Sequence, residues 1–238
     1  MIRAISSSSR SPALGRAVRY FAFLSLCLFI LVSGCEKKAT EVHATEIEGF
    51  AFHRLLVLPF EKAEDMVCPL CQQSTLSCRI EPEAISCLNK LLMARLRSIP
   101  GIELVPQTEV NRAILEIPEP ERTSLQLKGE FAILVARKVQ ADALMRNLVF
   151  CYRERAGSAV AASMPAAISF HIHLFRTDSE KMVWMGKYEE EQVALSENLL
   201  TAVEFFRRGA RWVRVEELAQ DGMAKAMADF PRSRGAGP

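Results

Sequence analysis

The chain has 238 residues, half of them hydrophobic, and a formal net charge of +2. This composition supports a packed core and one large domain or two small ones. The first 34 residues contain four arginines and no acidic residue, so the remainder of the chain carries a charge of about −2. This near-neutral balance argues against a nucleic-acid-binding protein.

Residues 21–32 form an apolar run in which only Ser25 is polar, and they follow the arginine-containing start of the chain. A positively charged segment followed by a short apolar one is typical of a secretory signal. A membrane-spanning helix needs about 20 apolar residues, and this run is shorter. We therefore expect a signal peptide over residues 1–34.

The signal ends in Val32-Ser33-Gly34-Cys35, which resembles the lipobox of bacterial lipoproteins. The resemblance implies cleavage before Cys35 and attachment of lipid, including palmitate, to that residue. Glu36 follows the cysteine where aspartate would favour the inner membrane, so the resemblance implies the periplasmic side of the outer membrane. The polar residues 35–49 then form a lipidated tether to the membrane.

Residues 50–230 are predicted to form a single periplasmic domain, and residues 231–238 a flexible tail. Apolar residues at alternating or helical spacing predict its elements. The predicted strands span residues 51–60, 102–105, 143–152, 166–175 and 182–193. The predicted helices span residues 82–98, 109–116 (capped by Thr108), 122–139, 196–208 and 213–230.

This order predicts an α/β fold. We expect a mixed sheet of about five strands with an antiparallel C-terminal hairpin, helices packed on the sheet, and two C-terminal helices. The turn at 176–181 joins the two strands of that hairpin. The small residues at 156–165 predict an exposed loop.

Three short segments resemble a group of periplasmic proteins that includes the TolB amino-terminal domain, LpoB-type lipoproteins and CsgG-like proteins. These segments are Leu56-Val-Leu-Pro-Phe60, Ala141-Asp-Ala143 and Met182-Val-Trp184-Met-Gly186. Gln140 stands where that group usually has glycine, and the cysteine-containing loop is no part of its pattern. The resemblance implies a partner-binding or scaffolding role without catalysis.

Four cysteines lie within twenty residues, in and just after the loop at 61–81: Cys68, Cys71, Cys78 and Cys87. In an oxidising compartment, structural disulfides are the favoured interpretation. A tetrahedral metal site, a redox pair at Cys68 and Cys71, and unpaired core thiols are the alternatives. With Cys151 the domain has an odd number of cysteines, so at least one stays unpaired within the chain.

His171 and His173 lie on one face of a predicted strand, and two imidazoles can share a metal ion. No third ligand is near them in sequence, so a polar, solvent-facing side of the sheet is the favoured interpretation. Farther along, Arg207, Arg208, Arg211 and Trp212 form a candidate partner or membrane surface. The favoured interpretation of this segment is a helix end with cations near its dipole.

No nucleophile motif and no glycine-rich phosphate loop is present, so no catalytic residue and no cofactor is predicted. The predicted function is that of a membrane-anchored envelope lipoprotein that binds an envelope protein, through residues 156–165 or 205–214. The alternative is a metal-binding or thiol-redox protein that uses the cluster from Cys68 to Cys87. The sequence names neither the partner nor the oligomeric state.

Overall fold

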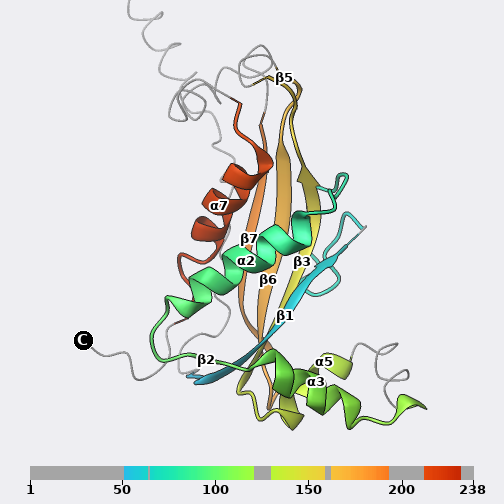
Figure 1. Ribbon diagram of the computed structural model, residues 1–238, viewed down its shortest axis with the longest axis vertical. Coiled ribbons are helices and arrows are strands. Elements are labelled where there is room, and N and C mark those ends of the chain that lie inside the picture. The colour runs from blue at the N-terminus through green and yellow to red at the C-terminus, as the bar shows by residue number, and fades with distance from the viewer. Residues whose placement is uncertain (1–50, 64, 121–129, 159–161, 193–211, 232–238) are drawn as a thin grey trace, which may run out of the picture. The chain divides into compact units, whose positions relative to one another are not determined.

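The computed structural model describes residues 51–63, 65–120, 130–158, 162–192 and 212–231 (Figure 1). The predicted signal peptide, tether, helix at 196–208 and C-terminal tail therefore lie outside the described residues. Among the residues described, no helix is long and apolar enough to cross a membrane.

A mixed sheet organises the domain, with strand order β2-β1-β3-β6-β7. Its strands are β1 (Arg54–Lys62), β2 (Glu103–Leu104), β3 (Ala143–Arg153), β6 (Ala167–Arg176) and β7 (Met182–Glu191). Strands β2, β1 and β3 run parallel, and β6 and β7 are antiparallel to their neighbours. The predicted α/β fold with an antiparallel hairpin is confirmed.

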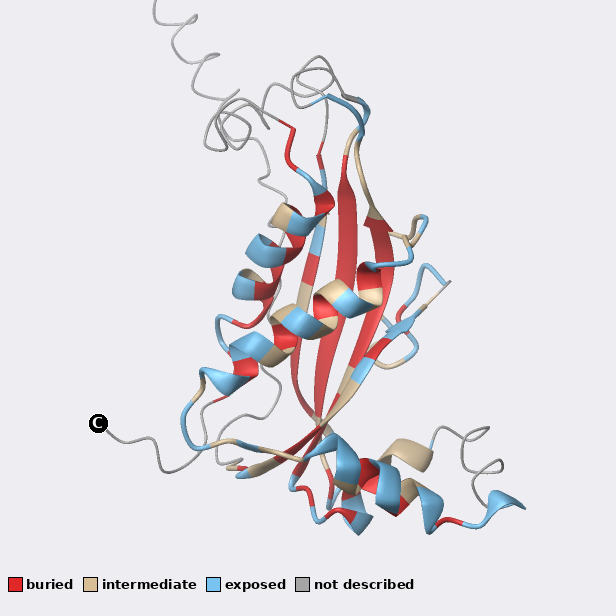
Figure 2. Ribbon diagram, in the orientation of Figure 1, coloured by how far each residue is buried: buried red, intermediate tan, exposed pale blue. Residues whose placement is uncertain are grey.

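One face of the sheet is covered by helices α2 (Ala84–Arg97) and α7 (Val215–Ala226), as Figure 1 shows. Residues four apart on α2, namely Leu88, Leu92 and Leu96, are buried against this face. Figure 2 shows the central strands buried along most of their length, whereas both helices alternate between buried and exposed residues. The main core therefore lies between the sheet and these two helices.

The other face has two separate covers. Helices α3 (Gln107–Leu115) and α5 (Phe131–Lys138) pack at one end, on Leu56 and Leu144. The loop that follows β1 lies farther along, on Leu148 and Phe150. Successive residues of a strand point to opposite faces, so from Ala143 to Phe150 the even-numbered residues of β3 meet these covers while the odd-numbered ones enter the main core. The register shifts between Val149 and Cys151, so that Cys151 faces the loop and Tyr152 enters the main core.

The turn between α5 and β3 carries the Ala141-Asp-Ala143 segment. Gln140 adopts φ +53°, the left-handed region that favours glycine. The Asp142 carboxylate accepts the backbone N–H groups of His53 and Arg54, each at 2.8 Å. This segment therefore ties the start of β3 to the start of β1.

Three expectations about local structure are corrected. Helix α3 begins at Gln107 after the extended Pro106, so Thr108 lies in its first turn and is not its cap. Helix α5 begins only at Phe131, and residues 121–129 of the helix expected there lie outside the described part. The expected loop at 156–165 contains a two-stranded hairpin of β4 (Ala156–Gly157) and β5 (Ala162–Met164).

Candidate metal centre

The loop after β1, residues 65–81, crosses the second face of the sheet, and we call it the strap. Its C-terminal end is fixed covalently, because Cys78 forms a disulfide with Cys151 of β3. The Cys78 N–H also donates to the carbonyl of Phe150 at 3.1 Å, and Ile80 pairs with Tyr152. The expectation of a disulfide is thus confirmed, and its partner comes from a strand 73 residues away.

The middle of the strap reaches the two antiparallel strands. The hydroxyls of Thr75 and Ser169 lie 2.5 Å apart, and both residues are buried. The Leu76 N–H donates to the Glu189 carboxylate at 3.0 Å. These contacts hold the strap across β6 and β7.

The N-terminal part of the strap folds into a tight turn around Cys-Pro-Leu-Cys. The Gln72 N–H donates to the Cys68 carbonyl at 2.8 Å, and the Cys68 N–H donates to the Gln73 carbonyl at 2.9 Å. Gln72 closes the turn with φ +59°. This conformation brings Cys71 and Cys68 onto β6, with Cys68 buried and Cys71 half-buried.

His171 and His173 lie beneath this turn, on the strap side of β6. Both are fully buried, at 0% exposure. The expectation of a solvent-facing polar side is therefore wrong at these two positions. The strand alternates as expected, but a loop about 100 residues earlier in the sequence covers its polar face.

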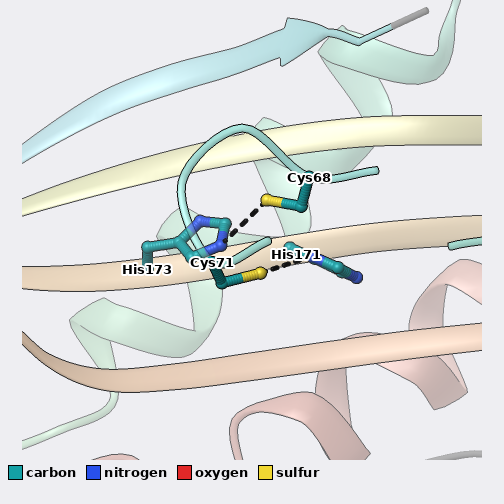
Figure 3. Close-up of side chains that lie close together, drawn as sticks. All are labelled: Cys68, Cys71, His171 and His173. Atoms are coloured by element: carbon teal, nitrogen blue, oxygen red, sulfur yellow. Dashed lines mark hydrogen bonds between the residues drawn. The ribbon is translucent and has the colours of Figure 1, made fainter. Parts of the chain in front are cut away.

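The four side chains converge, as Figure 3 shows. One potential ligand atom from each of Cys68, Cys71, His171 and His173 lies within 4.8 Å of the other three. Cys68 Sγ is 3.4 Å from His173 Nε2, and Cys71 Sγ is 3.6 Å from His171 Nδ1. Two thiols and two imidazoles thus surround one point.

These distances fit a tetrahedral metal ion. In a zinc site with Zn–S near 2.3 Å and Zn–N near 2.0 Å, a sulfur and a nitrogen ligand lie about 3.5 Å apart. The two sulfur–nitrogen distances, 3.4 and 3.6 Å, agree with that ligand separation, and all four ligand atoms lie within 4.8 Å of one another. Two thiolates and two imidazoles are a common ligand set of structural zinc sites, and thiolates also favour other soft ions.

The His173 ring is held in the tautomer that a metal requires. Its Nδ1 lies 3.2 Å from the carbonyl of Arg146, and a carbonyl can only accept, so Nδ1 carries the proton. Nε2 is then unprotonated and faces Cys68. A backbone carbonyl that orients a ligating imidazole in this way is a usual second partner in metal sites.

Both imidazoles are neutral over the physiological range. Burial lowers the pKa of His171 to about 3, with further lowering by His173 and Lys187. Burial also lowers the pKa of His173 to about 4. Neutral imidazole is the form that binds metal, so no proton has to leave these rings at neutral pH.

Burial has a different consequence for Cys68, because its metal-binding form is charged. Burial raises the pKa of its thiol to about 11, and the N–H groups of Cys71 and Leu70 partly oppose this by hydrogen bonding to the sulfur. Such N–H donors stabilise a thiolate. A bound cation would add the positive charge that compensates for burying the negative sulfur. A divalent ion with two thiolates and two neutral imidazoles has no net charge, which is the condition for burying the group.

The other residues singled out from the sequence lie elsewhere. Cys87 is a half-buried free thiol on α2, at the edge of the main core on the opposite face of the sheet. Cys78 is occupied by its disulfide. The structure therefore brings together two of the four clustered cysteines. The candidate lipid site, Cys35, lies outside the described residues.

The candidate arginine surface is described at one position only. Arg207, Arg208 and Arg211 lie outside the described residues. Trp212 is 8% exposed, and its carbonyl accepts a hydrogen bond from the Arg155 guanidinium. The Trp212 ring is therefore not an exposed anchor for a partner.

Each half of the centre is visible in the sequence, but no local pattern joins the two halves. The Cys68–Cys71 turn lacked a second cysteine pair, and the His171–His173 pair lacked a third ligand. The cysteine turn and the histidine pair each supply the two ligands that the other lacks. This match in the sequence is the feature from which the centre could have been predicted. The join depends on the strap crossing β6, a contact between residues about 100 positions apart.

No family model matches the sequence, and none of the curated proteins does. Among solved structures, the chain is similar to the PelC dodecamer subunit of Paraburkholderia phytofirmans, with 11% identity, coverage of 82% of this chain and 98% of that one, and a TM-score of 0.46. It is also similar to the LpoB C-terminal domain of Escherichia coli, with 19% identity and a TM-score of 0.37. The match covers 60% of this chain and 87% of that one. A third similar structure is lipoprotein GNA1162 of Neisseria meningitidis, with 14% identity and a TM-score of 0.39. The match covers 66% of this chain and 96% of that one. These values assign neither a family nor a function.

Proposed function

We propose that this protein is a zinc-binding lipoprotein of the bacterial cell envelope, in which the metal fastens the strap to the sheet. The observation that carries the proposal is the convergence of two thiols and two imidazoles within 4.8 Å. Zinc would join Cys68 and Cys71 of the strap to His171 and His173 of β6. The strap would then be held at both ends, by metal at one and by the disulfide at the other.

The ligand set favours a structural role over a catalytic one. Structural zinc sites are closed by four protein ligands, whereas catalytic sites keep one position for water or substrate. Here four protein ligands are available, and three of them are fully buried. We therefore propose a non-enzymatic protein.

Metal analysis of the full-length protein, purified in detergent from the membranes of expressing cells, tests the zinc proposal. We expect one zinc per chain, and a substituted cobalt ion with the intense visible absorption of tetrahedral thiolate ligation. Cys68→Ser should abolish both signals, whereas Cys87→Ser should leave both unchanged. A metal-free protein that also fails to bind cobalt under reducing conditions would overturn the proposal.

Membrane attachment is proposed on the sequence alone. Two or more acyl chains on Cys35 give stable anchoring, since each buried CH₂ contributes about 0.8 kcal/mol. We expect Cys35→Ala to move the protein from the membrane fraction to the soluble fraction, and Glu36→Asp to shift it from the outer to the inner membrane. Unchanged fractionation of Cys35→Ala would contradict the anchor.

Partner binding in the envelope is the second part of the proposal, and we place it at the β4–β5 hairpin, within the surface expected at residues 156–165. Met164, on β5, is 47% exposed, so the hairpin offers a partner one large apolar side chain. We expect crosslinking in intact cells to capture one envelope protein and Met164→Ser to weaken that capture. Recovery of no specific protein by the wild-type chain would remove this part.

A further inference from the structure

We infer that the proposed metal centre is redox-sensitive: a disulfide between Cys68 and Cys71 and a bound zinc ion exclude one another. This inference rests on the proposed zinc site. It adds that a disulfide-type oxidant, either a small disulfide or a protein dithiol oxidant, releases the metal by oxidising the two cysteines.

The geometry of the turn makes the two sulfurs natural partners. They belong to one Cys-x-x-Cys turn closed by two backbone hydrogen bonds, and their Sγ atoms lie within 4.8 Å of each other. The same strap forms a disulfide elsewhere, at Cys78 and Cys151, so its fold accommodates a disulfide and free thiols side by side. Cys68 and Cys71 are nevertheless free thiols.

The different exposure of the two thiols determines which of them reacts first. Cys68 is fully buried, whereas Cys71 is half-buried and within reach of a reagent from solvent. The Cys71 thiolate attacks one sulfur of the oxidant, forms a mixed disulfide and displaces the first thiolate. The Cys68 thiolate then attacks the Cys71 sulfur, closes the intramolecular disulfide and displaces the second thiolate.

The overall reaction transfers two electrons from the cysteines to the oxidant. The two zinc-bound thiolates are oxidised to one disulfide, the oxidant disulfide is reduced to two thiolates that take protons from solvent, and zinc leaves to solvent. A disulfide sulfur is a poor ligand for zinc because the thiolate is the metal-binding form. Two imidazoles alone would then remain, and they hold the ion far more weakly.

The disulfide at Cys78 limits the consequence to one half of the strap. The contacts at Thr75 and Leu76 and the covalent link at Cys78 do not involve the metal. Residues 65–74 lose the metal link to β6 when the ion leaves. The packing of Cys68 and Leu70 on Leu148 and Phe150 then remains as the contact of this part of the strap with the sheet.

The test uses zinc-loaded, full-length Cys87→Ser protein, in which Cys68 and Cys71 are the only free thiols of the domain. It is treated with oxidised glutathione, released zinc is followed with a chromogenic chelator, and disulfides are mapped by peptide mass spectrometry. We expect one zinc released per Cys68–Cys71 linkage formed, and rebinding after dithiothreitol and zinc are added. Zinc affinity should fall by about 100-fold or more in the oxidised form.

Two results would overturn the inference. One is formation of the Cys68–Cys71 disulfide with zinc still bound, and the other is full retention of both thiols and metal at oxidant concentrations that oxidise a control Cys-x-x-Cys peptide. Untreated protein that contains no zinc and takes up none would instead overturn the proposed function. The two failures are therefore distinguishable.

Discussion

The Nε2 atom of His173 lies 3.4 Å from the Sγ atom of Cys68, although 105 residues separate them in the sequence. This contact joins the strap to the middle strand of the antiparallel half of the sheet. Because the other ring nitrogen of His173 donates to the Arg146 carbonyl, Nε2 is left as an acceptor toward the sulfur. A metal ion would replace the thiol proton in this contact.

The first prediction is that His173→Ala removes the stabilisation that zinc provides. A ligand at 100 times its dissociation constant stabilises the folded state by about 2.7 kcal/mol. We expect the wild-type protein to show a rise in melting temperature when zinc is added, and His173→Ala to show none. Differential scanning calorimetry with and without zinc measures this.

His53→Ala is the matched control, because His53 lies on the surface beside Glu103 and away from the centre. It should keep the full response to zinc. An equal zinc response in His173→Ala and the wild type would show that His173 is not a ligand.

The sheet was predictable because its strands carry local signals. Alternation at Ile168, Phe170, Ile172 and Leu174 identified β6 and the face that enters the core. The start of α5 was not predictable, since the helical spacing continues before Phe131. Boundaries depend on tertiary contacts, and local periodicity does not record them.

The metal centre was only half predictable, for a different reason. Alternation shows which residues share a face of β6, but it does not show what covers that face. Ser169, His171 and His173 read as solvent-facing because polar residues usually are, and all three are fully buried. The strap that covers them is irregular, so it has no periodicity from which its course could be inferred.

The second prediction concerns the disulfide. Replacing Cys78 and Cys151 together by serine should lower the free energy of unfolding by about 2–4 kcal/mol, because the bond closes a loop of 73 residues in the unfolded chain. Urea denaturation of the double variant measures the change. Cys87→Ser, at a half-buried free thiol, is the control and should change little. A loss below about 0.5 kcal/mol would contradict the expected constraint on the unfolded chain.

The third prediction concerns the contact between α7 and β7. Alanine is normally favoured over glycine inside a helix by about 1 kcal/mol. At Gly222, however, an added Cβ would lie 2.3 Å from Cδ1 of the Tyr188 ring. That ring is fully buried and packs on Phe170 with centroids 6.0 Å apart, so it has no room to move away.

Gly222→Ala should therefore destabilise the protein by about 1–3 kcal/mol despite its better helix propensity. Thermal denaturation followed by circular dichroism measures the effect. Gln220→Ala, an exposed change in the same helix, is the control and should be neutral or slightly stabilising. A stabilised Gly222→Ala variant would mean that the helix and strand separate at little cost.

The fourth prediction is a loss of stability at high pH that depends on Tyr152. The side chain is fully buried, and burial raises the pKa of its hydroxyl, with smaller contributions from Cys87, Glu216 and Glu83. In the unfolded chain the pKa of tyrosine is about 10. Above that value the unfolded chain loses a proton that the folded chain keeps, so the free energy of unfolding falls as pH rises.

Tyr152→Phe removes this group with little change in shape. Between about pH 10 and pH 11, we expect the wild-type protein to lose about 1 kcal/mol more stability than the variant, since one proton is worth about 1.4 kcal/mol per pH unit once the unfolded group ionises. At pH 8 ionisation of the hydroxyl contributes nothing to the difference between the two proteins, because the hydroxyl is neutral in both the folded and the unfolded state there. Urea denaturation at the three pH values measures the difference. Identical pH dependence in the two proteins would mean that the Tyr152 hydroxyl ionises in the folded protein as readily as in the unfolded chain.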